Sequence, residues 1–395
     1  GPPPWRRGVR VGVLGHLLSF APGYRQAGVS RYIEFLLRAL PAAAPDIEAV
    51  VFTGPQAGEC GADFPTSLQW RRSRVPTGRP EVRILWEQVA GPVALRRAGV
   101  DLVHGPVNVM PLLDGLPGVV TVHDLAFRIY PEQYPRAKQR YLDLLTGLSV
   151  RRAARVITVS ESTRRDVLRF YRVDPERVVT VPNGVDPSLA PVTDRERLAA
   201  FRKEHGLPDD FILFVGTLQP RKNLVGLLRA YARMGARVDA PLVVAGGKGW
   251  MYEPVFNEVR ALGVEDRVIF AGYADPEDLA LWYSAATVFV YPSLYEGFGL
   301  PVLEAMACGT PVITSDTSSL PEVAGDAALL VNPRDVDAMA AAIARLMGDP
   351  ALRADLRERG LARARAFSWE RTARETAAVY RAACDAGRVE ERSEE

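Results

Sequence analysis

The 395-residue chain is 48% hydrophobic and carries 49 Lys and Arg against 47 Asp and Glu, for a net charge of +2. This length and apolar content can build the cores of two domains, and the balanced charge excludes a general binder of polyanions such as nucleic acid. The three cysteines, Cys60, Cys308 and Cys384, show neither metal-ligand spacing nor an obvious pairing, which is typical of the reducing cytosol. No apolar run approaches the roughly 20 residues that cross a bilayer, and the opening GPPPWRRG lacks the apolar region of a signal peptide. We therefore expect a cytoplasmic protein.

In the first half of the chain, short apolar runs alternate with amphipathic segments, a pattern that predicts a parallel sheet with helices on its faces. The predicted strands are Val9–Gly15, Ile47–Thr53, Val100–His104, Val119–His123, Val156–Ser160 and Val178–Pro182. The predicted helices are Val29–Leu40, Val82–Ala98, Arg136–Ala153 and Glu161–Tyr171.

The second half repeats the same pattern. Its predicted strands are Phe211–Val215, Leu242–Ala245, Val268–Ala271, Val288–Tyr291, Pro311–Thr314 and Ala328–Val331. Its predicted helices are Leu224–Met234, Tyr252–Leu262, Pro276–Ala285, Pro301–Ala307, Val336–Met347 and Leu352–Ala366.

Between the halves lies PNGVDPSLAPVTDRER, whose Pro, Asp and Gly residues indicate a linker. The predicted domains are residues 1–188 and 189–367. The fold class is therefore α/β, with two doubly wound, Rossmann-like domains that we expect to face each other across a cleft. Open parallel sheets bind ligands beyond the carboxyl ends of their strands, so each domain would hold one substrate.

One glycine-rich turn, SLYEGFGLPVLEAMACGTPVITS from Ser293 to Ser315, predicts an anion-binding helix start. Pro301 suits a first helical position because it needs no amide hydrogen there. The preceding amides of Phe298, Gly299 and Leu300 would then point out of the helix N-terminus toward an anion.

Glycines and carboxylates flank that turn. The glycines at 297 and 299 let a ligand approach the backbone closely. Glu304 lies about one turn inside the helix, where its carboxylate could accept hydrogen bonds from a ribose diol. The alternative interpretation is that Glu296 and Glu304 only complement the helix dipole.

A second motif, FVGTLQPRKNLVGLLRAY from Phe214 to Tyr231, places two cations beyond a strand that ends at Gly216. The guanidinium of Arg221 and the ammonium of Lys222 suit a diphosphate. The alternative is a solvated basic pair.

Several segments together resemble the signature of the family-4 (group 1) retaining glycosyltransferases of the GT-B fold, including mannosyltransferases. These are GTLQPRKN and FAGYADPEDLALWYSAATVFVYPSLYEGFGLPVLEAMACGTPVI in the second half, and PNGVD at the predicted linker. In the first half AGVSRYIEFLLRAL, TVHDLAF and VITVSESTRRDV occur in the expected order. The resemblance covers nearly the whole chain, is stronger in the second half, and implies that the last helix, within 368–395, packs back on the first domain.

The resemblance implies a role for each matching residue in binding a nucleoside-diphosphate sugar. Arg221 and Lys222 match the pair that holds the diphosphate, Glu304 the ribose ligand, and Glu296 the glutamate beside the sugar. The residues whose backbone is implied to contact the donor are Gly28, Gly216, Tyr273, Gly297, Phe298, Gly299 and Leu300. His123 matches a histidine near the transferred sugar, so His123, Arg221, Lys222 and Glu296 are the expected catalytic residues. Some relatives carry a further basic residue where this chain has Thr217.

Other candidates have weaker support. GGKGW, at 246–250, lacks the spacing of a phosphate loop, but Gly246 and Lys248 could still flank the nucleotide. His104 and Asp124 are candidate acceptor contacts, as is His16, and both histidines could equally be structural. His205 lies in a charged helix, where we expect it to be exposed.

The Asp-x-Asp pattern in RDVD, Arg334–Asp337, is one by which other glycosyltransferases hold a divalent metal. Here it opens a predicted helix, so Asp335 is better interpreted as its N-cap and Asp337 as a first-turn acid. We expect no metal and no cofactor.

The resulting hypothesis is a metal-independent retaining glycosyltransferase. It would move a hexose, with mannose from GDP-mannose preferred over UDP-hexoses, to a hydroxyl of a glycan or lipid-linked acceptor. The alternatives are a phosphorylase or nucleotide-sugar epimerase on the same fold, or a non-catalytic sugar-nucleotide-binding subunit.

A cluster of cations in the first half could bring the protein to the inner face of an anionic membrane, or could simply be solvated. Its members are Arg136, Lys138, Arg140, Arg151, Arg152, Arg164, Arg165 and Arg169.

Overall fold

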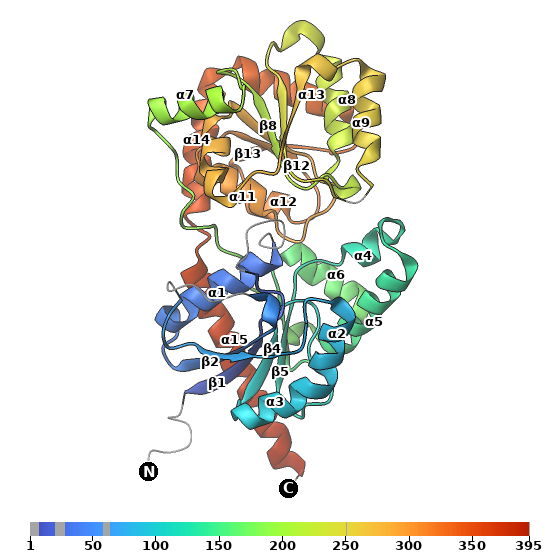
Figure 1. Cartoon of the computed structure of the whole chain (residues 1–395), viewed down its shortest axis with the longest axis vertical. Helices are drawn as coiled ribbons and strands as arrows, with labels where there is room; N and C mark the ends of the chain where they lie inside the picture. The colour runs from blue at the N-terminus through green and yellow to red at the C-terminus, as the bar shows by residue number, and fades with distance from the viewer. Residues whose placement is uncertain (1–7, 20–27, 58–63, 250, 395) are drawn as a thin grey trace. The chain divides into compact units, whose positions relative to one another are not determined.

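The computed structural model describes residues 8–19, 28–57, 64–249 and 251–394. The chain forms two compact units, Gly1–Gly184 with Trp369–Glu395 and Val185–Ser368 (Figure 1). The sequence placed the corresponding boundaries at 188/189 and 367/368. Cys60, residues 1–7 of the opening segment and Trp250 lie outside the described residues.

The first unit is built on a seven-stranded parallel sheet in the order β3-β2-β1-β4-β5-β6-β7. Its strands are β1 (Val9–Leu14), β2 (Ile47–Thr53), β3 (Gln69–Arg72), β4 (Leu102–Gly105), β5 (Gly118–Val122), β6 (Arg155–Thr158) and β7 (Val178–Thr180). All strands predicted in this half are confirmed, with ends shifted by at most two residues. The edge strand β3 was not predicted because its sequence QWRR is polar and only partly buried.

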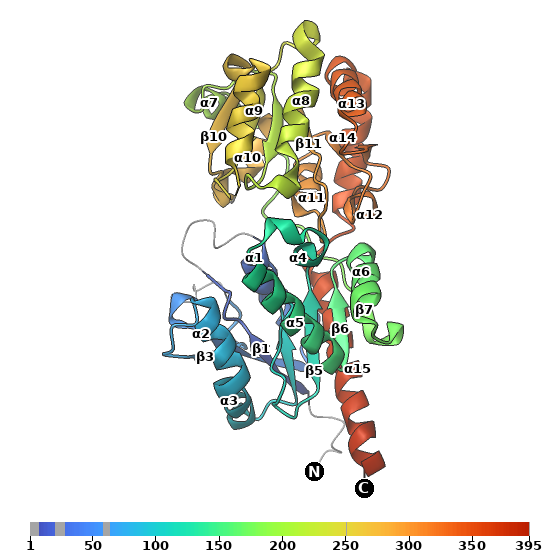
Figure 2. The same ribbon diagram turned by 90° about the vertical axis from the view of Figure 1, so that its right-hand side faces the viewer.

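Helices cover both faces of this sheet (Figure 2). One face packs on α1 (Val29–Ala43) and α15 (Trp369–Glu394), as the buried Ile33, Leu37 and Tyr380 show. The other face packs on the single π-helical turn η4 (Trp86–Ala90), α3 (Gly91–Ala98), α5 (Arg136–Arg152) and α6 (Glu161–Tyr171), and α2 (Pro80–Leu85) leads into η4. A short helix, α4 (Ala126–Ile129), was not predicted.

The helix predicted over Val82–Ala98 is interrupted by η4. Pro92 explains this difference, since it has no amide hydrogen for the carbonyl of Gln88 and its ring would clash with that carbonyl in a regular helix. A wider turn before the proline relieves the clash.

The second unit has a six-stranded parallel sheet in the order β10-β9-β8-β11-β12-β13. Its strands are β8 (Ile212–Val215), β9 (Leu242–Ala245), β10 (Val268–Gly272), β11 (Val288–Tyr291), β12 (Val312–Ser315) and β13 (Ala328–Val331). Its helices are α7 (Arg195–Glu204), α8 (Leu224–Met234), α9 (Glu253–Leu262), α10 (Leu279–Ala285), α11 (Leu300–Ala307), α12 (Leu320–Ala324), α13 (Val336–Gly348) and α14 (Pro350–Ala364). The predicted strands and helices of this half are confirmed.

Two helices of this unit were not predicted. Helix α12 spans only Leu320–Ala324. Helix α7 begins within the predicted linker, where Asp194 accepts hydrogen bonds from the amides of Glu196 and Arg197. An Asp ahead of a charged run is an N-cap signal that the Pro-rich surroundings concealed.

The strand order places the candidate site. The chain runs outward from β8 to β10 and then returns to the other side of β8 with β11. The loops that follow β8 and β11 therefore leave adjacent strands in opposite directions, which opens a crevice at the carboxyl edge of the sheet. Arg221 and Lys222 lie in the first loop, and Glu296 lies in the second.

Candidate active site

The loops after β8 and β11 are joined by hydrogen bonds. The carbonyl of Arg221 accepts from the amide of Leu294 at 2.8 Å and lies 3.0 Å from Ser293 Oγ. Asn223 adopts a left-handed φ of 57°, and its Nδ2 donates to the carbonyls of Pro292 and Pro333. The Arg-Lys pair is thus held in a fixed position against the turn that precedes α11.

Both predicted cations bind one predicted carboxylate. Arg221 Nη1 lies 2.9 Å from Glu296 Oε2, and Lys222 Nζ lies 2.7 Å from Glu296 Oε1. The three side chains are only 10–13% exposed. The sequence motifs predicted each residue, but they did not predict that the cations would share Glu296.

Two hydroxyl groups complete the shell around Glu296. Tyr291, which is fully buried, donates from its hydroxyl to Oε1 at 2.9 Å, and the same hydroxyl accepts from Lys222 Nζ. Ser293 Oγ donates to Oε1 at 2.6 Å. A carboxylate with this many donors is strongly held in its ionised form.

The electrostatics agree with that geometry. Burial acts to raise the pKa of Glu296, but the charges of Arg221 and Lys222 outweigh it and lower that pKa to about 2. Burial and the Glu296 charge raise the pKa of Tyr291 well above its usual range, so this hydroxyl stays a neutral donor. The cluster is a carboxylate shared by two cations at neutral pH.

Helix α11 starts and stops where the sequence predicted. It begins at Leu300 with Pro301 in its first turn, and Gly309 follows its last turn with a φ of 73°. Among the described residues, no acceptor is found for the amides of Phe298, Gly299 and Leu300. Those amides lie at the positive end of the helix dipole beside the ion cluster, and their binding of an anion stays a prediction.

Ser318 and Ser319 fix the turn before α11 through its backbone. Ser319 Oγ donates to the carbonyl of Phe298 at 2.6 Å and lies 2.9 Å from that of Glu296, and Ser318 Oγ accepts from the amide of Glu296 at 3.1 Å. The bonds orient the backbone so that its amides can face a ligand.

Glu304 lies on α11 and is 7% exposed. Its Oε2 accepts from the hydroxyl of the fully buried Tyr283 at 2.9 Å. Burial and the Glu304 charge raise the pKa of Tyr283 well above its usual range, so the hydroxyl remains a donor. Tyr283 and Tyr291 were not singled out in the sequence because both occur in apolar runs. The available signal was that a buried tyrosine hydroxyl needs a hydrogen-bond partner.

The loops after β8 and β9 approach each other closely. A Cβ on Gly246 would lie 1.9 Å from the carbonyl oxygen of Gly216, so no other residue fits at 246. Tyr273, after β10, is 40% exposed, and Lys248 Nζ lies 5.2 Å from the ring centroid of Tyr252. Gly216, Gly246 and Tyr273 all follow strands of one sheet at its carboxyl edge, as predicted, and their contact with a donor stays a prediction.

In the first unit, His123 directly follows β5. Its Nε2 lies 2.7 Å from the carbonyl oxygen of Pro106, and because a carbonyl only accepts, Nε2 carries the hydrogen. Burial lowers the pKa of this histidine, so the ring is neutral and Nδ1 is an acceptor. Tyr32 packs edge-on against the ring at 4.6 Å, and the amide of His123 donates to Asn108.

Two other predicted residues of this unit have a clear local role. Gly28 precedes α1 with a φ of 61°, and a Cβ there would meet nothing within 4 Å. Asp124 Oδ1 accepts from the amide of Ala126, at the start of α4. Neither arrangement tests the predicted contact with donor or acceptor.

His104 is not placed to contact an acceptor, so that prediction is corrected. The side chain is fully buried, with Nε2 2.8 Å from Thr121 Oγ1 and Nδ1 2.8 Å from the hydroxyl of Tyr380. Burial, with a smaller contribution from His123, lowers the pKa of His104 to about 3. His104 therefore ties β4 to α15.

The remaining histidines are also packed against neighbours. His16 is 2% exposed and contacts Thr77 Oγ1 and the edge of the Trp86 ring. His205 was expected to be exposed, but it is partly buried against the rings of Phe201 and Trp282. The charged sequence of α7 concealed this apolar side.

The Asp-x-Asp motif has the predicted helix-start geometry. Asp335 caps α13 by accepting from the amide of Ala338 at 2.9 Å, and Asp337 pairs with Arg233 at 2.7 Å. Within the described ranges, no group of three or more His, Cys, Asp or Glu side chains is arranged to hold a metal ion. No helix there is both long and apolar enough to cross a membrane.

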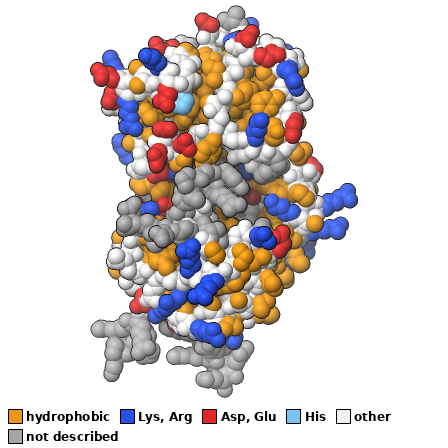
Figure 3. All heavy atoms as spheres, viewed as in Figure 1, with side chains coloured by type: hydrophobic (Ala, Val, Ile, Leu, Met, Phe, Trp, Pro, Cys, Tyr) orange, Lys and Arg blue, Asp and Glu red, His pale blue; other side chains and the backbone are white. Residues whose placement is uncertain are grey.

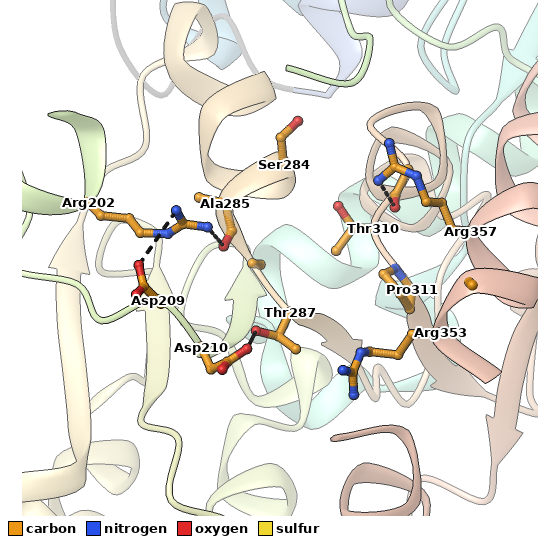
Figure 4. A pocket seen from close by; sticks show the side chains of 13 residues that line it. Arg202, Asp209, Asp210, Ser284, Ala285, Thr287, Thr310, Pro311, Arg353 and Arg357 are labelled. Atoms are coloured by element: carbon orange, nitrogen blue, oxygen red, sulfur yellow. Dashed lines mark hydrogen bonds and ion pairs between the residues drawn. The ribbon is translucent and has the colours of Figure 1, made fainter. Parts of the chain in front are cut away.

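A different cavity in the second unit, of about 330 Å³, lies at the amino ends of β8, β11 and β12 (Figure 4). Three arginines line it, and each donates to carbonyls at or beside a helix C-terminus. Arg202 donates to Ala285, Arg353 to Leu346 and Met347, and Arg357 to Gly309. These cations neutralise the negative ends of α10, α13 and α11, so the cavity is a poor anion site.

Comparison with known proteins agrees with this geometry. Residues 198–363 match the family model described as glycosyl transferases group 1, and residues 27–189 match that of glycosyltransferase family 4. The chain is 38% identical over 291 residues to the O-antigen chain mannosyltransferase B of Escherichia coli, covering 73% of this chain and 76% of that protein. It is 32% identical over 263 residues to the serotype-specific mannosyltransferase WbdA of E. coli, covering 65% of this chain but only 32% of that protein.

Among solved structures, sucrose-phosphate synthase from Thermosynechococcus elongatus aligns with a TM-score of 0.76 and 26% identity, covering 94% of this chain and 98% of that one. Both predicted features, two doubly wound α/β units and the GT-B architecture, are confirmed. The chain belongs to the group 1 glycosyltransferases, with a family-4 segment in its first half and the group 1 segment in its second.

Proposed function

We propose that this glycosyltransferase moves mannose from a nucleoside-diphosphate mannose to a hydroxyl of a glycan or lipid-linked acceptor, with retention of configuration and without a metal. The choice of mannose is supported by the two E. coli relatives, both named as mannosyltransferases. GDP-mannose is the preferred donor, with UDP-hexoses as the second choice.

The observation that carries the proposal is the Arg221–Glu296–Lys222 cluster beside the start of α11. When the sugar leaves, negative charge grows on the terminal phosphate. The two cations and the amides of residues 298–300 would stabilise that charge in a preorganised, poorly solvated place. A divalent ion is not needed in this scheme because these groups supply the positive charge.

We assign the rest of the donor to Glu304 of the second unit and, through the family resemblance, to His123 of the first. Glu304, held by Tyr283, presents its carboxylate from α11 for a ribose diol. His123 is neutral and can accept a hydrogen bond from a sugar hydroxyl at Nδ1. The acceptor hydroxyl would attack the face from which the phosphate leaves, and its proton would pass to the leaving phosphate oxygen.

The test is an assay of the full chain with GDP-mannose, UDP-glucose and UDP-galactose, each with mannosylated and lipid-linked acceptors, in EDTA and in Mn²⁺. The expected result is transfer from GDP-mannose in EDTA, with an α-linked product by NMR of the anomeric proton. An inverted product, or activity seen only with Mn²⁺, would overturn the mechanism. Sugar 1-phosphate released only with inorganic phosphate would identify a phosphorylase, and donor binding without turnover would identify a binding subunit.

A further inference from the structure

A groove in the first unit is lined by residues that the proposed function does not use. It lies between the edge strand β3 and helix α3 and has a volume of about 590 Å³ (Figure 2). Three arginines, Arg71, Arg72 and Arg97, line it together with aromatic side chains and alanines. Cavities of this size hold small organic ligands.

The groove exists because α3 presents small side chains toward the edge of the sheet. Ala94 and Ala98 are four residues apart on α3, so they lie on one side of the helix, and both line the groove. Leu95, between them, is fully buried and packs in the core. The methyl groups of the two alanines leave a hollow where larger side chains would have closed the contact between α3 and β3.

Aromatic rings form the floor of the groove. Phe52 on β2 and Trp86 in η4 are only 3% and 9% exposed, and their ring centroids lie 6.2 Å apart. Both belong to the core cluster on this face of the sheet, so packing fixes their positions. A fixed aromatic floor offers apolar area that suits the C–H face of a sugar ring.

The two walls of the groove each supply a guanidinium group. Arg71 of β3 is the register partner of Phe52 on β2, so both side chains lie on the same face of the sheet. Arg97 lies in the last turn of α3. Both arginines are exposed, and neither has a hydrogen bond or an ion pair with any residue that the structure describes. Their charges are therefore available to an anion.

Other arginines of this unit are committed to the protein itself. Arg72, at the end of β3, donates to the carbonyl of Pro55 at 2.8 Å. Arg152 binds Asp114 at 2.8 Å, and Arg164 donates to two backbone carbonyls. These contacts also correct the basic cluster expected from the sequence, because Arg152 and Arg164 hold the fold together and are not simply solvated.

The surroundings of the groove are basic. Residues 64–80, which include β3, carry Arg71, Arg72, Arg74 and Arg79 and no acidic residue. No Asp or Glu occurs among the described residues that line the groove. Figure 3 shows mainly basic charged side chains on the visible face of the first unit. A positive potential around a concave site attracts anions and disfavours cations.

We propose that this groove binds an anionic sugar. The sugar ring would pack on Phe52 and Trp86, and its carboxylate or phosphate would bind Arg71 and Arg97. Two sources would supply such a sugar, a charged residue of the acceptor glycan or a free sugar phosphate. The first source rests on the proposed function, whereas the second does not.

The test is calorimetric titration of the full chain with mannose 6-phosphate, with mannose and with inorganic phosphate. Mannose 6-phosphate is expected to bind more tightly than either of the other two, because it alone uses both the floor and the cations. Arg71→Gln with Arg97→Gln should weaken its binding about tenfold, since two exposed charge contacts are lost. Ala94→Leu keeps both charges but narrows the groove, and should weaken binding about fivefold or more.

Matched controls separate the groove from other anion sites. Arg165→Gln with Arg374→Gln removes two exposed arginines of the same unit, on α6 and α15, and should leave binding unchanged. Arg221→Ala removes the expected phosphate ligand of the second unit and should also leave it unchanged. Loss of binding in Arg221→Ala but not in the groove variants would overturn the proposal. So would equal affinity for inorganic phosphate and mannose 6-phosphate.

Kinetics of the Arg71→Gln, Arg97→Gln variant distinguish the two sources. If the acceptor supplies the sugar, KM should rise about fivefold for a mannose oligosaccharide that carries a uronic acid and stay unchanged for the neutral oligosaccharide. If a free sugar phosphate is the ligand, mannose 6-phosphate should change the rate with the neutral acceptor in the wild type but not in the variant. The calorimetry needs no transfer, so failure of the proposed donor and failure of the groove are distinguishable.

Discussion

The two ends of the second sheet both gather cations, but with opposite consequences. At the carboxyl edge, Arg221 and Lys222 meet the N-terminus of α11 and a buried carboxylate. At the amino edge, Arg202, Arg353 and Arg357 meet helix C-termini and donate to backbone carbonyls. The first set adds to the positive potential at the N-terminus of one helix. The second set cancels the negative potential at the C-termini of three helices.

From this difference we expect the polarity of nearby helices, more than the number of arginines, to decide where an anion binds in this unit. It also explains why the amino-edge cavity is not the candidate site. Its arginines are already committed to backbone carbonyls, whereas the carboxyl-edge cations are committed to Glu296, a charged side chain for which a phosphate can compete.

The largest expected effect tests the carboxyl edge directly. Arg221→Ala or Lys222→Ala should lower transfer by about 10²-fold or more, as for loss of a preorganised charge stabiliser. Calorimetry should show weaker binding of the nucleoside diphosphate with little change for the free nucleoside. If both variants kept wild-type diphosphate affinity, the phosphate position would lie elsewhere.

A second prediction concerns a variant that removes the negative charge of Glu296 but keeps the shape of its side chain. Glu296→Gln leaves two buried cations without their shared carboxylate, so transfer should fall by about tenfold or more and the protein should become less stable. Diphosphate affinity should rise or stay constant, because the phosphate no longer competes with a carboxylate. A fall in diphosphate affinity as large as that of Arg221→Ala would contradict this competition.

The same variant has a pH signature. The pKa of Glu296 is lowered from 4.5 to about 2, so its ion pairs contribute stability above pH 4.5, and this contribution is lost as the pH falls toward 2. The free energy of unfolding, measured in urea, should therefore fall more between pH 4.5 and pH 2 in the wild type than in Glu296→Gln. Parallel curves for the two proteins would show that the ion pairs add nothing to stability.

A smaller effect is expected at Tyr283, which acts through Glu304, the expected ribose ligand. Tyr283→Phe removes the hydroxyl bonded to Glu304 but keeps the buried ring. Loss of a hydrogen bond to a charged group should raise the KM for the sugar nucleotide about tenfold, with kcat changed less. Tyr231→Phe, which also removes a tyrosine hydroxyl bonded inside the same unit, is the control and should leave KM unchanged.

The smallest effect is expected at the amino edge. Arg357→Gln removes a cation that donates to the carbonyl of Gly309 beside the end of α11. Loss of a helix-end charge costs about 0.3–1 kcal/mol, so Tm should fall by roughly 1–4 °C for a unit of this size. Transfer should stay within about twofold of the wild type. A large loss of diphosphate binding in this variant would break the distinction between the two edges.

Most of the fold could be predicted from the sequence, because apolar runs and helix periodicity depend on neighbouring residues. The differences from the predictions have two causes, local signals hidden by their surroundings and contacts with distant partners. The interruption at Trp86–Ala90 and the hidden cap at Asp194 are local signals obscured by their surroundings. The burial of His104 between Thr121 and Tyr380 depends on α15, whose Tyr380 lies 276 residues further along the chain.

The sequence by itself indicated the charged candidates for the site and determined the start of α11, because glycine, proline and carboxylate positions in one turn obey local rules. Only the tertiary structure decided that Arg221 and Lys222 share Glu296 and that Tyr283 and Tyr291 complete the shells of the two glutamates. The two ion pairs join loops about 75 residues apart and arise where β8 and β11 become neighbours at the switch of strand order. Which loops meet is set by the order of the strands in the sheet. The sequence of no single segment specifies that order.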